Sequence, residues 1–491
     1  MNGSIKELAA NPALAKRCSE IEQKDSRQSI NWYRNKFMSD RDRILYCKAF
    51  LRLAGKTQVY APLQSDHQRT RLTHTLEVSQ IARTISKALE LDCELTEAIA
   101  LGHDIGHTPF GHAGERLLHE ILSPTNNRNA MIPRSTPIYD LTSLKSQKQF
   151  SSLYGFKHNL QSVRCVIEDF DSRREEYGLN LTNYTLWGMA HHSSLSYKPG
   201  KVDTIFTVPE FYDRYQKYLR NADGRNAWSF EAMIVAEADE IAQMHHDLED
   251  AIRQKAVFPE KGIELVNSLI NLPYMNEMDK ATLSILKNEV PTKEYLIANI
   301  SRIVVNTLVT SLIEASKHNL QVLLAHHTCA DILKADYLAD SEPDSLEGMI
   351  RCAINYDVFG KDTNSKLINR FKSNLSNCVI NSFNVQRTDS KGKYIIKNIF
   401  EAYFTNPQQL PDSVFRNMYL TFQRNVSEFT FNRPYFQMDN SDLRQAVMAQ
   451  IFAVREKKEI ANEIWIMRVI CDYIAGMTDS FAISEYEKLY G

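Results

Sequence analysis

The feature that most limits the fold of this chain is the helical spacing of its apolar residues. Between residues 293 and 317 they recur every three or four positions, at Leu296, Ile300, Ile303, Val304, Leu308 and Leu312, as on the buried face of a helix. Residues 459–482 have the same periodicity, whereas alternating strand patterns are scarce. With only 17 Gly and 15 Pro in 491 residues, regular structure should dominate. We therefore expect an all-α protein, in which residues 56–60 and 393–396 could pair as short strands.

One segment concentrates side chains that bind metals or transfer protons. Residues 102–115 contain His103, Asp104, His107, His112 and Glu115 among four glycines. Imidazole nitrogen and carboxylate oxygen together suit divalent Mn, Fe, Zn or Mg, and glycine lets the backbone turn tightly and approach a ligand. A helix end with exposed polar residues would explain one such histidine, but titratable groups rarely gather in this number without a function. The segment predicts a metal or catalytic site.

Further ligands are expected where a metal-binding side chain interrupts an apolar helix stripe. In residues 73–91, His74 lies one turn before the apolar stripe and on the same helix face. In residues 230–252, Asp239 lies in line with apolar positions, where an unpaired carboxylate is costly to bury. His74, His103, Asp104 and Asp239 would thus offer two imidazoles and two carboxylates from three helical segments. Such a set leaves coordination positions for water and substrate, as catalytic metal sites do.

Four stretches of this sequence resemble one enzyme family. His…His-Asp…Asp is the signature of the HD-domain metal-dependent phosphohydrolases, and residues 69–78, 97–104, 156–162 and 472–479 look like the deoxyguanosine triphosphate triphosphohydrolases within them. The likeness extends from about residue 40 to residue 481. It implies an HD-domain helical core and hydrolysis of a dNTP, dGTP foremost, to the deoxynucleoside and inorganic triphosphate, with the cut at the alpha phosphorus. Such a reaction would serve control of dNTP pools.

Three histidines are candidates for proton transfer in this reaction, because imidazole titrates near neutral pH. They are His107, His112 and His158. Glu115 follows His112 by three residues, so on a helix it could orient that imidazole. The resemblance implies that His112 and Glu115 form an acid–base pair and that His158 lies across the phosphates. His107 is one helical turn from His103, and we expect it to brace the metal ligands.

The resemblance also assigns substrate contacts. Arg71 would bind the alpha phosphate, for which a guanidinium is suited, and Arg52 and Leu53 would lie near the base and sugar. Asp247 would accept the 3′-hydroxyl, although helical spacing alone places His246 closer than Asp247 to the face of Asp239. Asn159 would be a further substrate contact. Gln243 stands where the family often has Tyr. We expect no chemical role for four other histidines: His191, His192, His245 and His246. The Gln243 departure leaves sugar and base selectivity open.

Composition limits the partners and the compartment. Lys and Arg number 58 against 60 Asp and Glu, for a formal net charge of -2, which argues against a protein that coats nucleic acid. Eight widely spaced Cys without a Cys-x-x-Cys fit reduced thiols in the cytoplasm. No uninterrupted apolar run approaches membrane-spanning length, and the N-terminus lacks the layout of a signal peptide. We expect a cytoplasmic protein without a membrane partner.

The domain boundaries follow from the motifs and from composition. We expect a helical N-terminal arm over residues 1–50, the HD core over residues 51–252 and a C-terminal helical region over residues 253–491. Residues 123–152 are rich in Ser, Thr, Asn and Pro, which indicates an insertion in the core. The resemblance adds a homo-oligomer, often a hexamer, and for some relatives an allosteric dNTP site or binding of single-stranded DNA.

Two other functions remain open. An HD-type phosphodiesterase or a ppGpp-type pyrophosphohydrolase would use the same metal ligands, but the glycine-rich histidine segment after His103 and Asp104 favours the triphosphohydrolase. A nucleotide-sensing or single-strand-binding regulator could keep the pocket and have little turnover. The presence of both His112 and Glu115 argues against that regulator.

Overall fold

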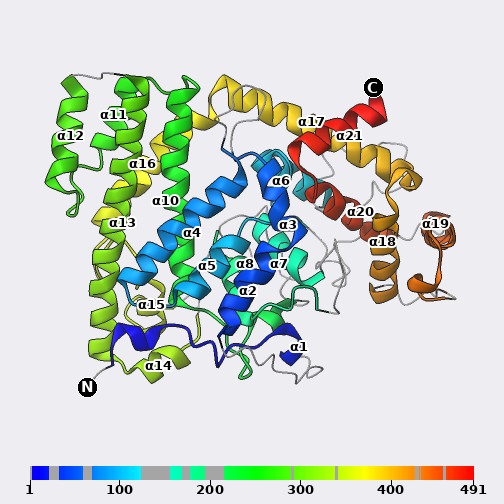
Figure 1. The fold of residues 1–491 in the computed structure, drawn as a ribbon, viewed down its shortest axis with the longest axis horizontal. Coiled ribbons are helices and arrows are strands. Elements are labelled where there is room, and N and C mark those ends of the chain that lie inside the picture. Colours follow the sequence, from blue (N-terminus) through cyan, green and yellow to red (C-terminus); the bar gives the residue numbers. More distant parts are fainter. Residues whose placement is uncertain are drawn as a thin grey trace.

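A computed structural model describes residues 3–21, 33–58, 69–122, 155–168, 177–193, 215–288, 292–337, 341–425, 431, 433–456 and 460–491 of the chain. Its regular structure in these ranges is helical (Figure 1), which confirms the all-α prediction. The N-terminal and HD-region helices are η1 Ile5–Leu8, α1 Cys18–Ile21, α2 Lys36–Leu45, α3 Lys48–Leu51, η2 Arg52–Gly55, α4 Arg71–Ala88, α5 Cys93–Gly102, α6 Gly111–Leu122, α7 His158–Glu168, α8 Asn183–His191, η6 Gln216–Leu219 and α10 Phe230–Arg253.

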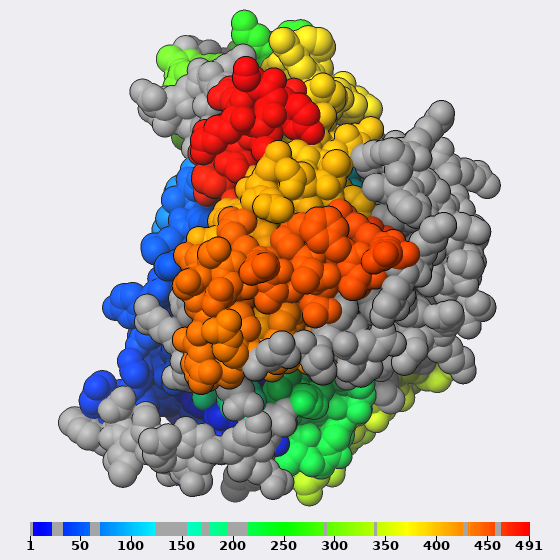
Figure 2. All heavy atoms as spheres, turned by 90° about the vertical axis from the view of Figure 1, so that its right-hand side faces the viewer, coloured from blue at the N-terminus to red at the C-terminus, as the bar shows by residue number. Residues whose placement is uncertain are grey.

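The rest of the chain continues as helices. A first group, beside α10 on the left of Figure 1, comprises α11 Pro259–Asn267, α12 Glu277–Asn288, α13 Lys293–His326, α14 Cys329–Lys334, α15 Leu346–Arg351 and α16 Thr363–Ile380. A second group, on the right, comprises α17 Phe383–Thr405, η7 Pro407–Gln409, α18 Asp412–Asn425, η8 Tyr435–Gln437, α19 Asn440–Glu456, α20 Ile460–Ala475 and α21 Asp479–Tyr490. In Figure 2 the orange and red atoms of this second group form one continuous face.

The two short strands predicted from the sequence are wrong for the residues that can be compared. Residues 393–396 lie inside α17. Residues 56–58 are described, and there Thr57 makes only an isolated bridge with Thr70. The predicted insertion at residues 123–152 lies outside the described residues.

The longest of these helices, α13, contains a long apolar window. Within the described ranges, α13 is the one helix that has the length and composition to cross a bilayer, and half of its most apolar window is buried inside the fold. It packs along α10. Thr292 caps its start by accepting a hydrogen bond from the Tyr295 amide at 3.1 Å, which satisfies an otherwise unpaired helix donor.

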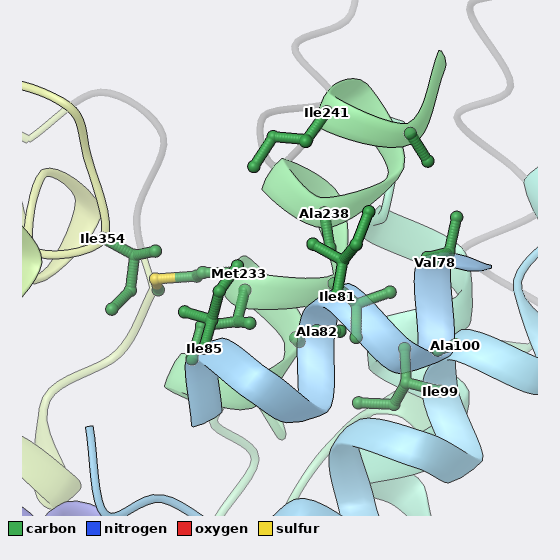
Figure 3. Packing of buried hydrophobic residues seen from close by; sticks show 14 of the residues in the cluster. Val78, Ile81, Ala82, Ile85, Ile99, Ala100, Met233, Ala238, Ile241 and Ile354 are labelled. Atoms are coloured by element: carbon green, nitrogen blue, oxygen red, sulfur yellow. The ribbon is translucent and has the colours of Figure 1, made fainter. Parts of the chain in front are cut away.

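The first hydrophobic core brings the HD helices together. Figure 3 shows Val78, Ile81 and Ile85 of α4 packed beside side chains of α5 and α10. These three α4 side chains are almost fully buried and follow one another at helical spacing. Burial of this stripe fixes how α4 rotates about its axis, and it therefore fixes where His74, one turn before Val78, must point.

The second hydrophobic core joins the C-terminal helices to α6. It contains Leu117, Leu118 and Ile121 of α6 together with α17, α18, α19 and α20. The break between α20 and α21 is tied to the HD region, because Asp479 accepts hydrogen bonds from the amides of Thr57 at 3.2 Å and Phe110 at 3.0 Å. The C-terminal region thus supports the segment that contains His107 and His112.

Lys56 makes a second tie between the same parts. Its ammonium group is buried and donates to the Ala475 carbonyl at 2.9 Å and to the His107 carbonyl. Burial, together with nearby Arg52, lowers the pKa of Lys56 to about 7. The end of α20 and the histidine segment are therefore held by one side chain.

Candidate metal and catalytic site

Three helical segments bring the predicted metal ligands together. His74 Nε2 is 3.0 Å from Asp239 Oδ1, and His103 Nε2 is 3.8 Å from the same oxygen. His103 Nε2 is also 3.5 Å from Asp104 Oδ1. These side chains come from α4, the end of α5 and α10, whose orientations the first core sets. The structure brings all four predicted ligands to one place.

The hydrogen bonds of His103 leave one nitrogen available for a metal. Its Nδ1 lies 2.6 Å from the Ala100 carbonyl, which can only accept, so Nδ1 carries the proton and Nε2 has a lone pair. That buried Nε2 has no hydrogen-bond partner among the described residues. Ligand atoms of His74, His103 and Asp104 all lie within 4.8 Å of one another. The donor set fits a divalent cation.

Asp104 is held between positive and polar neighbours. Arg71 Nη1 lies 2.7 Å from Asp104 Oδ2, and His107 Nε2 lies 3.2 Å from Oδ1. Burial alone would raise the pKa of Asp104, but His107, His103 and Arg71 hold it well below its ordinary value. The carboxylate is therefore ionised at neutral pH, as a metal ligand must be. His107 thus contacts the predicted ligand Asp104, and its bracing role stays a prediction.

The same balance applies to Asp239. Its burial opposes ionisation, whereas the hydrogen bond from His74 and the proximity of His103 lower its pKa below the ordinary value. Two ionised carboxylates and two imidazoles then share one buried volume. Without a cation, the charges of Asp104 and Asp239 would repel each other there.

A second group is centred on the carboxylate of Glu115. Its Oε2 is 3.0 Å from His112 Nδ1, and its Oε1 is 2.9 Å from His158 Nδ1. Oε1 also accepts a hydrogen bond from the His158 amide at 2.9 Å. Burial opposes ionisation of Glu115, but His158 and His112 bring its pKa well below the ordinary value. One charged carboxylate therefore orients two imidazoles.

The two groups are in contact through His107. Its ring stacks on that of His158, with centroids 3.9 Å apart and an interplanar angle of 16°. Burial, then Arg71 and His158, hold the pKa of His107 well below the ordinary value, so the stacked ring is neutral. His112 differs from its neighbours because 54% of its side chain is exposed, which leaves it accessible to a substrate.

The structure places a histidine in the site that sequence reasoning set aside. His192 is buried, its Nδ1 is 2.9 Å from the Met189 carbonyl, and its Nε2 is 3.2 Å from His158 Nε2. Burial, then His103 and His158, lower the pKa of His192 to about 3. The signal that identified His74 was also present here, because His192 continues the apolar stripe of Leu186 and Met189 by one turn.

His246, for which the sequence predicts no chemical role, lies beside the predicted metal ligand His74. It is fully buried, and its Nδ1 is 3.3 Å from His74 Nδ1. The sequence did place His246 nearer than Asp247 to the face of Asp239. His191, in contrast, stacks on Trp187 with centroids 4.2 Å apart, and its Nδ1 lies 2.8 Å from the Trp187 carbonyl.

The predicted substrate contacts are more dispersed. Asp247 is on α10, where burial and then Asp250 and Glu240 raise its pKa to about 7. Its Oδ1 has no hydrogen-bond partner within the described part of the chain. Gln243 is half-buried one turn earlier on α10, and Asn159 is buried, with its side-chain amide donating to the Ala190 carbonyl.

Arg52 and Leu53 are in η2. Leu53 is fully buried in the first core. Arg52 lines a cavity of about 300 Å³ together with Asp472 and Tyr473 of α20. The cavity lies on the C-terminal side of the HD region, so the assignment of these two residues to the base and sugar stays a prediction.

Comparison with known proteins adds a family to this geometry. The HD domain model matches residues 71–244, and the model for a phosphohydrolase-associated domain matches residues 359–428 and 440–488. A deoxyguanosinetriphosphate triphosphohydrolase-like protein of Rickettsia canadensis (strain McKiel) is 32% identical over 464 residues, which is 94% of each chain. The protein of the same description from Rickettsia rickettsii (strain Iowa) is 31% identical over 93% of this chain and 92% of its own. The protein of the same description from Geobacter metallireducens is 28% identical, over 100% of this chain and 97% of its own.

Proposed function

Because this chain belongs to the HD-domain phosphohydrolases of the deoxyguanosinetriphosphate triphosphohydrolase-like family, we propose that it hydrolyses a deoxynucleoside triphosphate. Its products would be the deoxynucleoside and inorganic triphosphate, with dGTP as the first candidate substrate. The role would be control of the dNTP pool. The observation that supports this most is the contact between the two buried groups, in which His107 touches Asp104 and stacks on His158.

His74, His103, Asp104 and Asp239 would hold the divalent cation, which could be Mn, Mg, Fe or Zn. A bound cation of this kind polarises a phosphoryl oxygen and lowers the pKa of coordinated water. The residues prepare this chemistry by presenting two ionised carboxylates and the lone pair of His103 Nε2 inside a buried site. They also exclude bulk water, which strengthens every charge interaction there.

Proton transfer would fall to the imidazoles that Glu115 orients. Attack of water at the alpha phosphorus breaks the bond to the 5′-oxygen, and that oxygen must gain a proton to leave as the deoxynucleoside hydroxyl. In its protonated form His112 would donate through Nδ1 to Glu115 and carry a second proton on Nε2, which it could give to the leaving oxygen as a general acid. His158, on the other side of Glu115, would face the phosphates.

The substrate would be held by charge and by shape. The Arg71 guanidinium already contacts Asp104 through Nη1, and its Nε has no partner among the described residues, so it can bind an alpha-phosphate oxygen. Asp247 would accept the 3′-hydroxyl, and Gln243 would pack beside the deoxyribose one turn away on α10. Asn159, Arg52 and Leu53 complete the proposed contacts.

The family also suggests how the protein is assembled and where it works. We infer a cytoplasmic homo-oligomer, with a hexamer as the first candidate, and an allosteric site for a dNTP or for single-stranded DNA. Light scattering after size-exclusion chromatography would give the oligomer size. Activity that appears only in mixtures of dNTPs would identify an activator nucleotide.

Product analysis tests the proposed reaction. The purified protein with Mn²⁺ is incubated with each dNTP, alone and mixed, and triphosphate is separated from pyrophosphate and phosphate. We expect triphosphate and deoxynucleoside in equal amounts. Pyrophosphate or a monophosphate would instead favour an HD-type phosphodiesterase or a ppGpp-type pyrophosphohydrolase. Tight dGTP binding without cleavage would favour a regulator.

A further inference from the structure

His246 and Glu77 lie on the Nδ1 side of His74, whereas Asp239 lies on its Nε2 side. His246 Nδ1 is 3.3 Å from His74 Nδ1, and His246 Nε2 contacts Glu77 Oε2. His246 is fully buried, whereas 37% of the Glu77 side chain is exposed. Glu77 follows His74 by three residues on α4, so the chain of contacts begins and ends on one helix and passes through α10.

The positions of the protons follow from which atom each nitrogen faces. If His74 Nε2 is to bind a cation beside Asp239, that nitrogen must be unprotonated, and the proton of the neutral ring is then on Nδ1. The neighbour of that Nδ1 is His246 Nδ1, which must accept the hydrogen bond. The proton of His246 is consequently on Nε2, where it is donated to Glu77.

We propose that His246 and Glu77 are positioning residues for the metal site, because together they fix the tautomer and the orientation of His74. The strength of metal binding then depends on a carboxylate that does not touch the metal. Partners of this kind hold a ligating imidazole in place and increase its basicity. The inference rests on the proposed ligand set, but it is independent of which nucleotide the protein hydrolyses.

A competing interpretation uses the same residues differently. His245 Nε2 is 3.2 Å from the Glu77 oxygen that His246 contacts, and these three side chains could hold a cation of their own. That second site would need a lone pair on His246 Nε2. The hydrogen bonds of the proposed arrangement put a proton on this nitrogen, so His74 cannot keep its Nδ1 donor bond to His246 while His246 Nε2 binds a second cation.

His245 provides a matched control for the experiment. It is the neighbour of His246 on α10 and reaches the same carboxylate, but no contact joins it to His74. Its replacement removes one imidazole beside Glu77 and leaves the His74–His246–Glu77 contacts in place. Any effect on metal binding that is specific to the proposed arrangement should therefore be absent from His245→Ala.

The test measures binding of Mn²⁺ by calorimetry and the visible spectrum of bound Co²⁺, in the full-length protein freed of metal. For Glu77→Leu we expect Mn²⁺ to bind about 10–100-fold more weakly, with a changed Co²⁺ spectrum and one ion per chain. Glu77→Gln keeps an oxygen that can accept from His246 and should recover most of the affinity. His245→Ala should bind as the wild-type protein does. Melting of the metal-free variants shows whether each one is folded.

Three results would overturn the proposal or the ligand set beneath it. Wild-type affinity and spectrum in Glu77→Leu would show that His74 needs no such support. Two ions in the wild-type protein and one in Glu77→Leu, with the affinity of the remaining ion unchanged, would establish a separate site at Glu77. Binding that is insensitive to His103→Ala would instead reject the proposed metal ligands themselves. Should Glu77→Leu fail to fold, Glu77→Ala, which also lacks an acceptor for His246, takes its place, and wild-type affinity and spectrum in that variant would reject the role.

Discussion

A single carboxylate, Glu115, organises two imidazoles that have different surroundings. His158 is buried between Glu115, His107 and His192, whereas the side chain of His112 is 54% exposed. Because the His112 side chain is exposed and that of His158 is buried, the two histidines should differ in what their loss does to turnover. The proposed ligand Asp104 contacts His107, whereas His112 contacts Glu115, so loss of the proposed proton donor and loss of the metal should be separable.

We expect His112→Ala to lower turnover by about 10²–10⁴-fold, the usual contribution of a general acid, and to leave the metal content unchanged. Asp239→Ala should lose both turnover and metal. Elemental analysis of the purified variants, together with triphosphate release, measures the two properties. Metal retained by Asp239→Ala would remove Asp239 from the ligand set.

Glu231 gives a prediction about pH. It is fully buried on α10, and its Oε1 accepts hydrogen bonds from the amides of Ala10 at 3.0 Å and Asp92 at 2.9 Å. Burial raises its pKa from 4.5 to about 7, against the lowering effect of these two bonds. Between those values the unfolded chain releases a proton that the folded protein keeps, so the contribution of Glu231 to stability falls as pH rises and is lost above pH 7.

Glu231→Gln keeps an acceptor for both amides and cannot ionise. We expect it to raise the free energy of unfolding at pH 8 by about 1–3 kcal/mol, with no gain at pH 4. Urea unfolding at both values measures this, and Glu264→Gln, an exposed residue, is the control. A gain of equal size at both pH values would show that burial of charge is not the cause.

At the scale of helices, α17 supports the segment that contains His107 and His112 by close contact. A side-chain Cβ at Gly392 would lie 2.7 Å from Cβ and Cγ of Phe110. Phe110 has a positive φ of 59° and directly precedes Gly111, the first residue of α6, which also has a positive φ, of 57°. The approach of α17 therefore fixes a backbone turn that ends at Gly111, directly before His112.

We expect Gly392→Ala to push Phe110 away, to cost about 1–3 kcal/mol of stability through overpacking and to lower turnover. The unfolding free energy and the rate of triphosphate release are the two measurements. Ser390→Ala changes an exposed position of the same helix and should alter neither. An active, stable Gly392→Ala would mean that the turn does not depend on α17.

The helices that carry the ligands were predictable because their apolar stripes are long. Those stripes appear as α4 and α10 with bounds within a few residues of the predicted ones. Residues 393–396 misled because Ile395 and Ile396 favour strands, a preference that depends on context. In the structure these two side chains belong to a helical stripe with Ile399 and Phe400, all buried in the second core.

Sequence could not predict contacts that depend on how distant helices meet. Local patterns did identify the predicted ligands His74, His103 and Asp239, because each is a metal-binding side chain in or next to an apolar helical segment. The hydrogen bond from His158 to Glu115 joins residues separated by 43 positions, and that from His246 to Glu77 joins residues separated by 169. No local pattern fixes such pairs, since they follow from the packing of α10 on α4 and of α7 near α6.

For the whole molecule, a buried ion pair connects the HD region to the C-terminal helices. Arg164 of α7 contacts Asp472 of α20 through Nη1 at 2.6 Å and Nη2 at 2.8 Å. Arg468 Nε lies 3.4 Å from the same carboxylate. Removing one partner of such a pair leaves a buried charge, whereas removing both removes the attraction and the unpaired charge together.

We expect Arg164→Met and Asp472→Leu each to destabilise the protein by about 3–5 kcal/mol. Asp472→Leu should cost more, because it leaves two guanidinium groups behind. The double variant should be less destabilised than the sum, by up to about 3 kcal/mol, as measured by urea unfolding. The exposed pair Lys280–Glu277 should show less than about 1 kcal/mol of coupling. Full additivity at Arg164 and Asp472 would contradict the link.

The two hydrogen bonds from Lys56, to His107 and to Ala475, join residues that the ribosome adds at very different times. A ribosome delivers the HD helices long before α20, so the nascent chain holds a lysine beneath His107 whose second acceptor has not yet been translated. We therefore expect the nascent chain to lack a finished catalytic loop until its last helices emerge. Synthesis itself would then delay the proposed hydrolysis until α20 has been made and has folded against the HD region.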